Sequence, residues 1–391
     1  MQRLFLLIVF VLIACQPATS TVTLISPTLT TTAFPTETPV PQPTTTETLT
    51  QVPTIPSSTV ELDGAEVPPG FSLIKFADLY RPTAFAFDDQ GRIYVTSQDG
   101  NVYLLHDEDH DGQTESRSTF ATGYYFPVGV AIHYPSGDVY VSYQGAITIL
   151  RDTDGDGRSD RERIFVDDLP FGQHQNDNLK FGPDGKLYIG VGSACDACED
   201  ADPRSAAILR FDVETEQSEI VATGLRNPYD LAFHPETGDL FATDNGRDDL
   251  GMDAPFEELN HIVLGGDYGY PDCWNEQDAA GCEKTIPAVA FFEAHSSANG
   301  VDFYNGENFP AEYRGNVFVS IFGSWLKPNV QTGIQRVILS PSGNTYTGET
   351  SWFIRFPAGV MPLPLLFGPD DSLYVGDYIN DAIYRISYGI P

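Results

Sequence analysis

The sequence predicts an all-β protein, a six-bladed β-propeller with four-stranded antiparallel blades. Two observations predict this fold: one two-stranded pattern recurs along the chain, and helical periodicity is nearly absent. The pattern is a turn, an alternating strand, a hairpin with Gly or Asp, and a second alternating strand with an aromatic near its start. Its six copies cover residues 82–96, 127–141, 177–191, 227–243, 300–320 (the loosest) and 363–375.

Each copy supplies a β-hairpin, and an isolated hairpin would leave its apolar faces exposed to water. Neighbouring sheets must therefore stack around a common axis, which leaves only short, protected edges. The first strand of a propeller blade lines the central channel, so residues just before each first strand are expected at the axial mouth. We therefore look for chemistry in these positions.

The N-terminal residues predict export. Arg3 precedes an apolar run too short to span a bilayer permanently, and Cys15 follows Ala14 as in a bacterial lipobox. We expect a lipoprotein signal peptide over 1–14, a lipidated Cys15 and Thr/Pro-rich disordered tether over 15–60, and the propeller over 61–391. The protein would then be held by lipid at the outer face of the cell membrane, or lie in a periplasm. An ordinary signal peptide, with Cys15 removed, is the alternative.

The charge balance excludes some partners. With 55 acidic and 21 basic residues the formal net charge is −34, which argues against nucleic acid and against any membrane contact other than a lipid anchor. An excess of acid instead suits bound cations.

Four cysteines remain beyond Cys15, and they form two local pairs. In an exported protein this favours two disulfides, Cys195 with Cys198 and Cys273 with Cys282. A structural zinc site built from all four is the alternative.

Two segments repeat the acid spacing of a calcium-binding loop. Alternate carboxylates around a glycine turn offer a hard cation several oxygens at once, although the twelfth position lacks the usual bidentate Glu in both segments. We assign these loops a structural role. The expected ligands are Asp107, Asp109, Asp111 and Glu115 in the first loop and Asp152, Asp154, Asp156 and Asp160 in the second.

Residues 172–271 carry the most specific motifs. These are the stretch that begins Gly172-Gln-His174, then Gly192-Ser-Ala-Cys195, Gly224-Leu-Arg226-Asn227-Pro228, Asn245-Gly-Arg247-Asp248 and Gly265-Gly-Asp-Tyr268. In this order and at these spacings they resemble the pyrroloquinoline-quinone (PQQ) dependent aldose, pyranose and sorbosone dehydrogenases. The resemblance covers most of the predicted propeller.

The resemblance implies PQQ and Ca²⁺ as cofactors, a small-molecule sugar as substrate and an unidentified electron acceptor. It implies that His174 takes the hydroxyl proton of the sugar, as a neutral imidazole can at neutral pH. The cofactor contacts that it implies are Arg226, Asn227, Gly246, Arg247 and Lys327, and part of a second, structural calcium site is Glu258, Tyr268 and Asp278.

The sequence departs from the family pattern at two positions. Met361 stands where the family has a basic cofactor contact, and Asp177 stands where a basic residue is common. Both departures favour a first alternative, a calcium-stabilised propeller that binds carbohydrate or a surface without catalysis. A second alternative is a metal-dependent sugar lactonase, for which Asn227, Asp244 and Asn245 would supply oxygen ligands.

Overall fold

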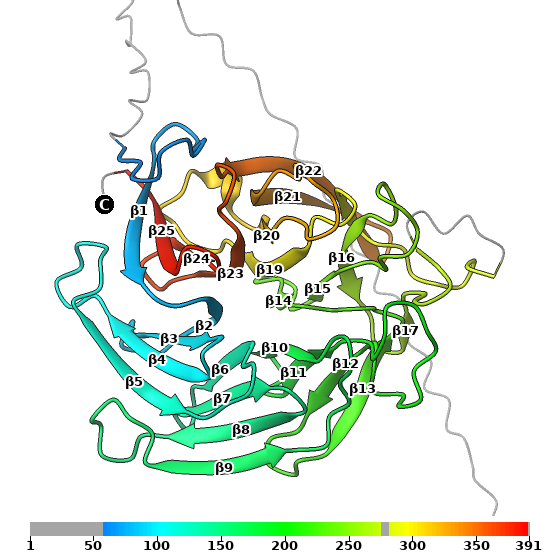
Figure 1. Cartoon of the computed structure of the whole chain (residues 1–391), viewed down its shortest axis with the longest axis horizontal. Helices are drawn as coiled ribbons and strands as arrows, with labels where there is room; N and C mark the ends of the chain where they lie inside the picture. The colour runs from blue at the N-terminus through cyan, green and yellow to red at the C-terminus, as the bar shows by residue number, and fades with distance from the viewer. Residues whose placement is uncertain (1–57, 275–280, 390–391) are drawn as a thin grey trace, which may run out of the picture. The chain divides into compact units, whose positions relative to one another are not determined.

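The computed structural model describes residues 58–274 and 281–389. Within them the strands form six sheets arranged around a central axis (Figure 1). The expected signal peptide over 1–14, Cys15, most of the expected tether and Asp278 lie outside the described residues. None of the described helices is long and apolar enough to cross a membrane.

Each blade contains four antiparallel strands, which in the first five blades follow in chain order from the axis outward. Blade one consists of β2 (Pro82–Phe87), β3 (Ile93–Ser97), β4 (Asn101–His106) and β5 (Ser116–Thr122). Blade two consists of β6 (Gly129–His133), β7 (Asp138–Tyr143), β8 (Ala146–Arg151) and β9 (Arg161–Val166). Blade three consists of β10 (Asn176–Phe181), β11 (Leu187–Val191), β12 (Ala207–Phe211) and β13 (Ser218–Thr223). Blade four consists of β14 (Leu231–Phe233), β15 (Leu240–Asp244), β16 (Glu257–Ile262) and β18 (Ala290–Phe292). Blade five consists of β19 (Ala298–Phe303), β20 (Val317–Ile321), β21 (Gly333–Ser342) and β22 (Thr345–Arg355). Blade six consists of β23 (Pro362–Phe367), β24 (Leu373–Asp377), β25 (Ala382–Tyr388) and β1 (Phe71–Asp78). A 3₁₀ turn, η1 (Ala311–Tyr313), joins β19 to β20.

The sixth blade closes the ring. Its outermost strand is β1, which comes before the first repeat and pairs antiparallel with β25, Phe71 opposite Tyr388. Residues 59 and 60 already pair alongside β1, because the Leu73 amide donates to the Thr59 carbonyl. The first strands of neighbouring blades contact each other all the way round, from β2 and β6 to β23 and back to β2.

Apolar clusters fill the interfaces between neighbouring blades. The aromatic near the start of each second strand projects into one of them, as the repeat pattern predicts. Tyr94 meets Phe120 between blades one and two, and Tyr374 meets Phe76 between blades six and one, both edge to face. Such ring pairs add about 0.5–1.5 kcal/mol each to the area that they bury.

The predicted all-β, six-bladed propeller is confirmed, and all six repeats coincide with first and second strands of blades. One feature adds to the prediction. The two-residue strand β17 (Gly266–Asp267) pairs in parallel with β13 and gives the third blade a fifth strand.

Candidate active site at the axial mouth

A cavity of about 410 Å³ opens at one end of the axis. Its walls come from residues at or just before the first strands of several blades, together with rim loops. The lining residues are Thr83, Tyr125, Phe126, Val128, Gln144, Gly172, Gln173, His174, Gln175, Asp177, Asn227, Tyr229, Phe322, Trp325, Leu363 and Tyr378. The volume lies within the range of about 300–1,000 Å³ typical of small-molecule sites, and six of the sixteen lining residues are aromatic.

His174 lies in this cavity with its ring held in one tautomer. Its Nδ1 is 3.1 Å from the Ser193 carbonyl oxygen and 3.0 Å from Ser193 Oγ, whose own hydrogen goes to the Cys195 carbonyl. A carbonyl oxygen can only accept, so Nδ1 carries the proton and Nε2 keeps its lone pair. The prediction that His174 lies at the axial mouth agrees with this position.

The surroundings keep this imidazole neutral. Burial disfavours the charged ring, and the nearby Arg226 guanidinium adds to the effect, so the pKa of His174 is lowered to about 4. The side chain fits because Gly192 has no Cβ: a Cβ there would collide with the Cβ of His174 and lie 2.8 Å from Asn227 Oδ1. His174 is therefore an acceptor at neutral pH.

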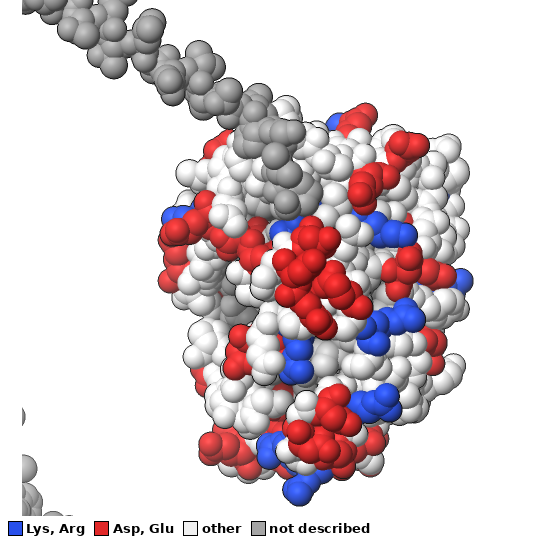
Figure 2. All heavy atoms as spheres, turned by 90° about the vertical axis from the view of Figure 1, so that its left-hand side faces the viewer, with Lys and Arg blue, Asp and Glu red and all other residues white. Residues whose placement is uncertain are grey.

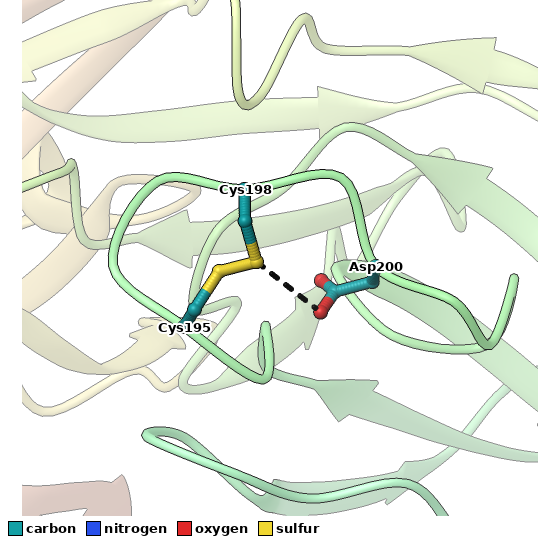
Figure 3. A group of neighbouring side chains, drawn as sticks. All are labelled: Cys195, Cys198 and Asp200. Carbon is teal, nitrogen blue, oxygen red and sulfur yellow. Dashed lines mark hydrogen bonds between the residues drawn. A yellow bond between two sulfur atoms is a disulfide. The ribbon is translucent and has the colours of Figure 1, made fainter.

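The loop beside His174 is closed by a disulfide between Cys195 and Cys198, whose Cα atoms are 6.0 Å apart (Figure 3). The second predicted disulfide joins Cys273 and Cys282. Both predicted pairings are confirmed, and all four sulfurs are used, so the zinc alternative falls. In the first loop Asp200 lies beside the sulfur of Cys198, at 4.0 Å, and accepts the Ala194 amide.

Arg226 lies behind the cavity wall and is almost fully buried. Its guanidinium donates to the carboxylate of Asp196 at 2.7 Å and to that of Asp248 at 3.1 Å. It also donates to the backbone carbonyls of Asp196 and Asn245. Arg226 therefore ties the disulfide loop, which orients His174, to the loop after β15.

Two buried oxygens at the cavity have no hydrogen-bond partner among the described residues. These are Asn227 Oδ1 and Asp177 Oδ2. Burial, together with the charges of Asp230 and Asp244, raises the pKa of Asp177 well above its usual value and so favours its protonated form. An unpartnered buried oxygen costs about 1–3 kcal/mol, which a bound ligand would offset.

Gly246 and Arg247 lie together with Glu258 and Tyr268 around a separate cavity of about 30 Å³, which also borders Arg226. The space suffices for a water or a small ion. Arg247 pairs with Asp249 and lies over the Trp274 ring, 5.4 Å from its centroid. The Tyr268 hydroxyl donates to the His261 carbonyl and accepts the Val263 amide. The structure thus brings four predicted residues together, away from the axial cavity.

Lys327 follows the exposed Trp325 at the rim, and its ammonium pairs with Glu293 at 3.1 Å and with Asp253 at 3.3 Å. Met361 precedes β23, and its carbonyl accepts the amide of Tyr378, a wall residue of the axial cavity.

A set of buried carboxyls near the cavity was not singled out from the sequence. Glu257 accepts the amides of Gly246 and Ser297, and its pKa is raised by burial to about 8. Burial likewise raises the pKa of Asp230 to about 6. In the sequence these acids lie within or next to apolar strand residues, and that is the signal which could have identified them.

The two acidic loops lie at the rim of blades one and two, after β4 and β8. Figure 2 shows acidic side chains gathered in patches on this side of the ring. Asp107, Asp109, Asp111 and Glu115 offer ligand atoms within 4.8 Å of one another, as do Asp152, Asp154 and Asp156. Asp160, predicted as a ligand, is not in the second group; its carboxylate accepts the Thr153 hydroxyl.

Each loop also bonds to the preceding blade. The Thr114 amide donates to the Phe76 carbonyl of β1 at 3.0 Å, and the Ser159 amide donates to the Phe120 carbonyl of β5 at 2.8 Å. An ion in the first loop would therefore stabilise the seam where β1 closes the ring.

Removing calcium is expected to lower the melting temperature by several degrees. A ligand that binds only the native state stabilises it by about 2.7 kcal/mol at a concentration of a hundred times its Kd. Differential scanning calorimetry in Ca²⁺ and in EGTA measures this shift. A double variant, Asp109→Asn with Asp154→Asn, should melt at the same temperature in both buffers. Equal melting of the wild type in both would refute calcium binding by these loops.

A family model described as "Domain of unknown function (DUF7133)" matches residues 57–385. The chain belongs to this DUF7133 family. An uncharacterized protein of Borreliella burgdorferi is 24% identical over 356 residues, which cover 83% of this chain and 90% of that protein.

The DUF7133 chain is also similar to proteins of known name. A PQQ-dependent sugar dehydrogenase of Hypocrea jecorina is 27% identical over 240 residues, 52% of this chain and 55% of that protein. The calcium structure of a Trichoderma reesei carbohydrate-active enzyme of family AA12 superposes with a TM-score of 0.71 at 19% identity, over 85% of this chain and 98% of that one. The holo form of the pyranose dehydrogenase PQQ domain from Coprinopsis cinerea superposes with a TM-score of 0.70 at 16% sequence identity. The superposition covers 85% of this chain and 99% of that one. The resemblance inferred from sequence is thereby confirmed in the fold.

Proposed function

We propose that this protein is a sugar dehydrogenase that oxidises an aldose or pyranose hydroxyl outside the cytoplasm with PQQ and Ca²⁺. The observation that carries the proposal is His174, a neutral imidazole with a free Nε2 lone pair, in an aromatic-walled cavity of about 410 Å³. A hydroxyl oxidation needs a base for the hydroxyl proton, and this nitrogen is one.

The axial cavity fits a planar quinone. Tyr125, Phe126, Phe322, Trp325 and Tyr378 supply ring faces on which such a ligand can stack. Asn227 Oδ1 and Asp177 Oδ2 are buried polar atoms that have no hydrogen-bond partner among the residues that the structure describes, and they are available to such a ligand. When bound, PQQ would supply the electrophilic carbonyl that takes up the hydride.

The chain's own residues then have separate tasks. His174 accepts the substrate proton at Nε2, while the Ser193 carbonyl holds the opposite nitrogen. Arg226 keeps the 195–198 loop in place, and that loop sets the position of Ser193. The aromatic side chains of the wall, such as Phe322 and Tyr378, offer the ligand apolar contact surface.

The two disulfides support a location of the protein in an oxidising compartment outside the cytoplasm. The proposal includes export by a signal peptide and anchoring of the protein through a lipidated Cys15. It also includes calcium ions bound in the two acidic rim loops and beside Gly246. The electron acceptor is a separate molecule that takes electrons from the reduced cofactor.

The deciding experiment reconstitutes the protein with PQQ and Ca²⁺, records the quinone absorbance spectrum and follows dye reduction with aldoses. A shifted quinone spectrum together with sugar-dependent dye reduction is expected. Absence of both at micromolar PQQ would refute the dehydrogenase.

Acidification is expected to abolish activity only near pH 4. Burial disfavours the imidazolium form of His174, so the base stays unprotonated at every pH above its lowered pKa of about 4 and is lost as the pH falls through that value. The profile of kcat/KM between pH 3.5 and 8 measures this limb, with circular dichroism at each pH to show that the fold persists. An acid limb near pH 6.5, the ordinary value for histidine, would contradict the assigned environment.

A propeller that binds carbohydrate without catalysis is the second candidate. Tyr125 and Trp325, 70% and 73% exposed at the cavity rim, favour it because exposed rings stack on sugar faces. Sugar binding by calorimetry without dye reduction would support this candidate. A lactonase metal site is less favoured, since both Asp244 carboxylate oxygens accept amides, those of Arg226 and Asn227.

A further inference from the structure

Arg81 is a cation beside the axial cavity. It lies between β1 and β2, directly before Pro82, at the repeat position that Asn227 and Met361 hold before Pro228 and Pro362. Its guanidinium carbon lies 5.3 Å from the ring centroid of Tyr378, a wall residue of the cavity. Thr83, two residues along, is itself part of the wall.

The conformation of Arg81 is fixed by several contacts. Its φ of 36° is left-handed, which a residue with a side chain adopts only when its surroundings impose it. The Arg81 amide donates to Asp381 Oδ1, and its carbonyl accepts the Gln98 amide. Nη1 donates to Gln98 Oε1 at 2.7 Å. The side chain is therefore pre-organised against the Tyr378 ring.

The charge of Arg81 is not neutralised by a neighbouring acid. No carboxylate of the described residues lies within ion-pair distance of its guanidinium, whereas Arg226, Arg247 and Lys327 are each paired. In a chain with a formal net charge of −34, an unpaired cation beside a cavity is a local attraction for an anion. The remaining N–H groups form a planar fork that matches a carboxylate.

We propose that Arg81 binds a carboxylate of the ligand that occupies the axial cavity. The inference rests on the proposed function for the identity of that ligand. The carboxylate comes from one of two sources: PQQ, which carries three, or a sugar acid bound as substrate. Arg81 is thus a positioning residue for an anionic group, while His174 remains the base.

The experiment measures equilibrium binding of PQQ, D-glucuronate and D-glucose by isothermal titration calorimetry. It compares the wild type with Arg81→Gln and Arg81→Lys. Arg117→Gln is the matched control, because Arg117 likewise lies over a tyrosine ring, that of Tyr103, and donates to a neutral carbonyl, but on the outer part of a blade. Melting temperatures show that each variant is folded.

Arg81→Gln is expected to weaken binding of the carboxylate ligand by about ten- to hundredfold, the worth of one hydrogen bond to a charged group. Arg81→Lys should recover part of the loss, and Arg117→Gln should change nothing. A loss for PQQ identifies the cofactor as the source; a loss for glucuronate alone, with glucose unaffected, identifies the substrate.

Unchanged affinities of Arg81→Gln for both carboxylate ligands would overturn the inference. So would a wild type that binds neither of them. A wild type that binds glucuronate but not PQQ refutes the proposed dehydrogenase, and the glucuronate affinities of the two Arg81 variants still decide the role of this residue.

Discussion

His174→Ala is expected to lower the turnover number of dye-linked sugar oxidation by about 10²–10⁴-fold, the usual contribution of a general base. PQQ binding should stay nearly intact, because a base acts on the substrate proton in the transition state while cofactor affinity is a ground-state property. The Nε2 lone pair is the group removed, and its partner Ser193 remains satisfied through its bond to the Cys195 carbonyl.

The measurement pairs steady-state kinetics with a PQQ titration of the same preparation. His133→Ala is the matched control, since that histidine ends β6, in the turn to β7 and at the opposite end of the strand from the axial cavity, where its Nδ1 contacts Ser136. Full activity of His174→Ala would remove the residue from the chemistry. Loss of PQQ binding together with activity would give it a structural role.

Arg226→Ala is expected to lower the free energy of unfolding by about 3 kcal/mol. Arg226 is 4% exposed, so its loss leaves the carboxylates of Asp196 and Asp248 close together without the guanidinium that both of them accept from. Removing one partner of a buried ion pair typically costs about 3–5 kcal/mol, and the lower end applies because both acids are partly exposed. Chemical denaturation measures the change.

Arg247→Ala is the control for this prediction. Its pair with Asp249 lies closer to solvent, and exposed pairs contribute about 0–1 kcal/mol. Arg226→Ala should also weaken PQQ binding, as the resemblance implies, because the loop that holds Ser193 and His174 loses its attachment. Equal stability of the two variants would show that Arg226 does not hold the two loops together.

The fold was predictable because its repeat is local. A turn, two alternating strands and the aromatic that packs between blades fall within about 15 residues, so each copy is visible in the sequence. The closure of the ring was not predicted. Residues 71–78 have no copy of the repeat, and their partner β25 is assigned to them only by the geometry of the ring.

The site was predicted in part for the same reason. His174 and Asn227 stand out because they directly precede first strands, and both line the axial cavity. The ion pairs of Arg226 could not be predicted, because Asp196 and Asp248 come from loops whose approach depends on how two blades pack. Arg81 carries the same positional signal as Asn227 but lies before the first repeat, where no resemblance drew attention to it.

The pairing of β1 with β25 also dictates the order in which this protein can assemble. Ser72 Oγ donates to the carbonyl of Gly389, a contact that spans 317 residues of chain. During synthesis Phe71 and Phe76 are made before the five interior blades, but β25, which covers them, is the last of the described strands to be made. The nascent ring therefore carries an open, apolar strand edge until β25 has been made, and such an edge favours edge-to-edge aggregation.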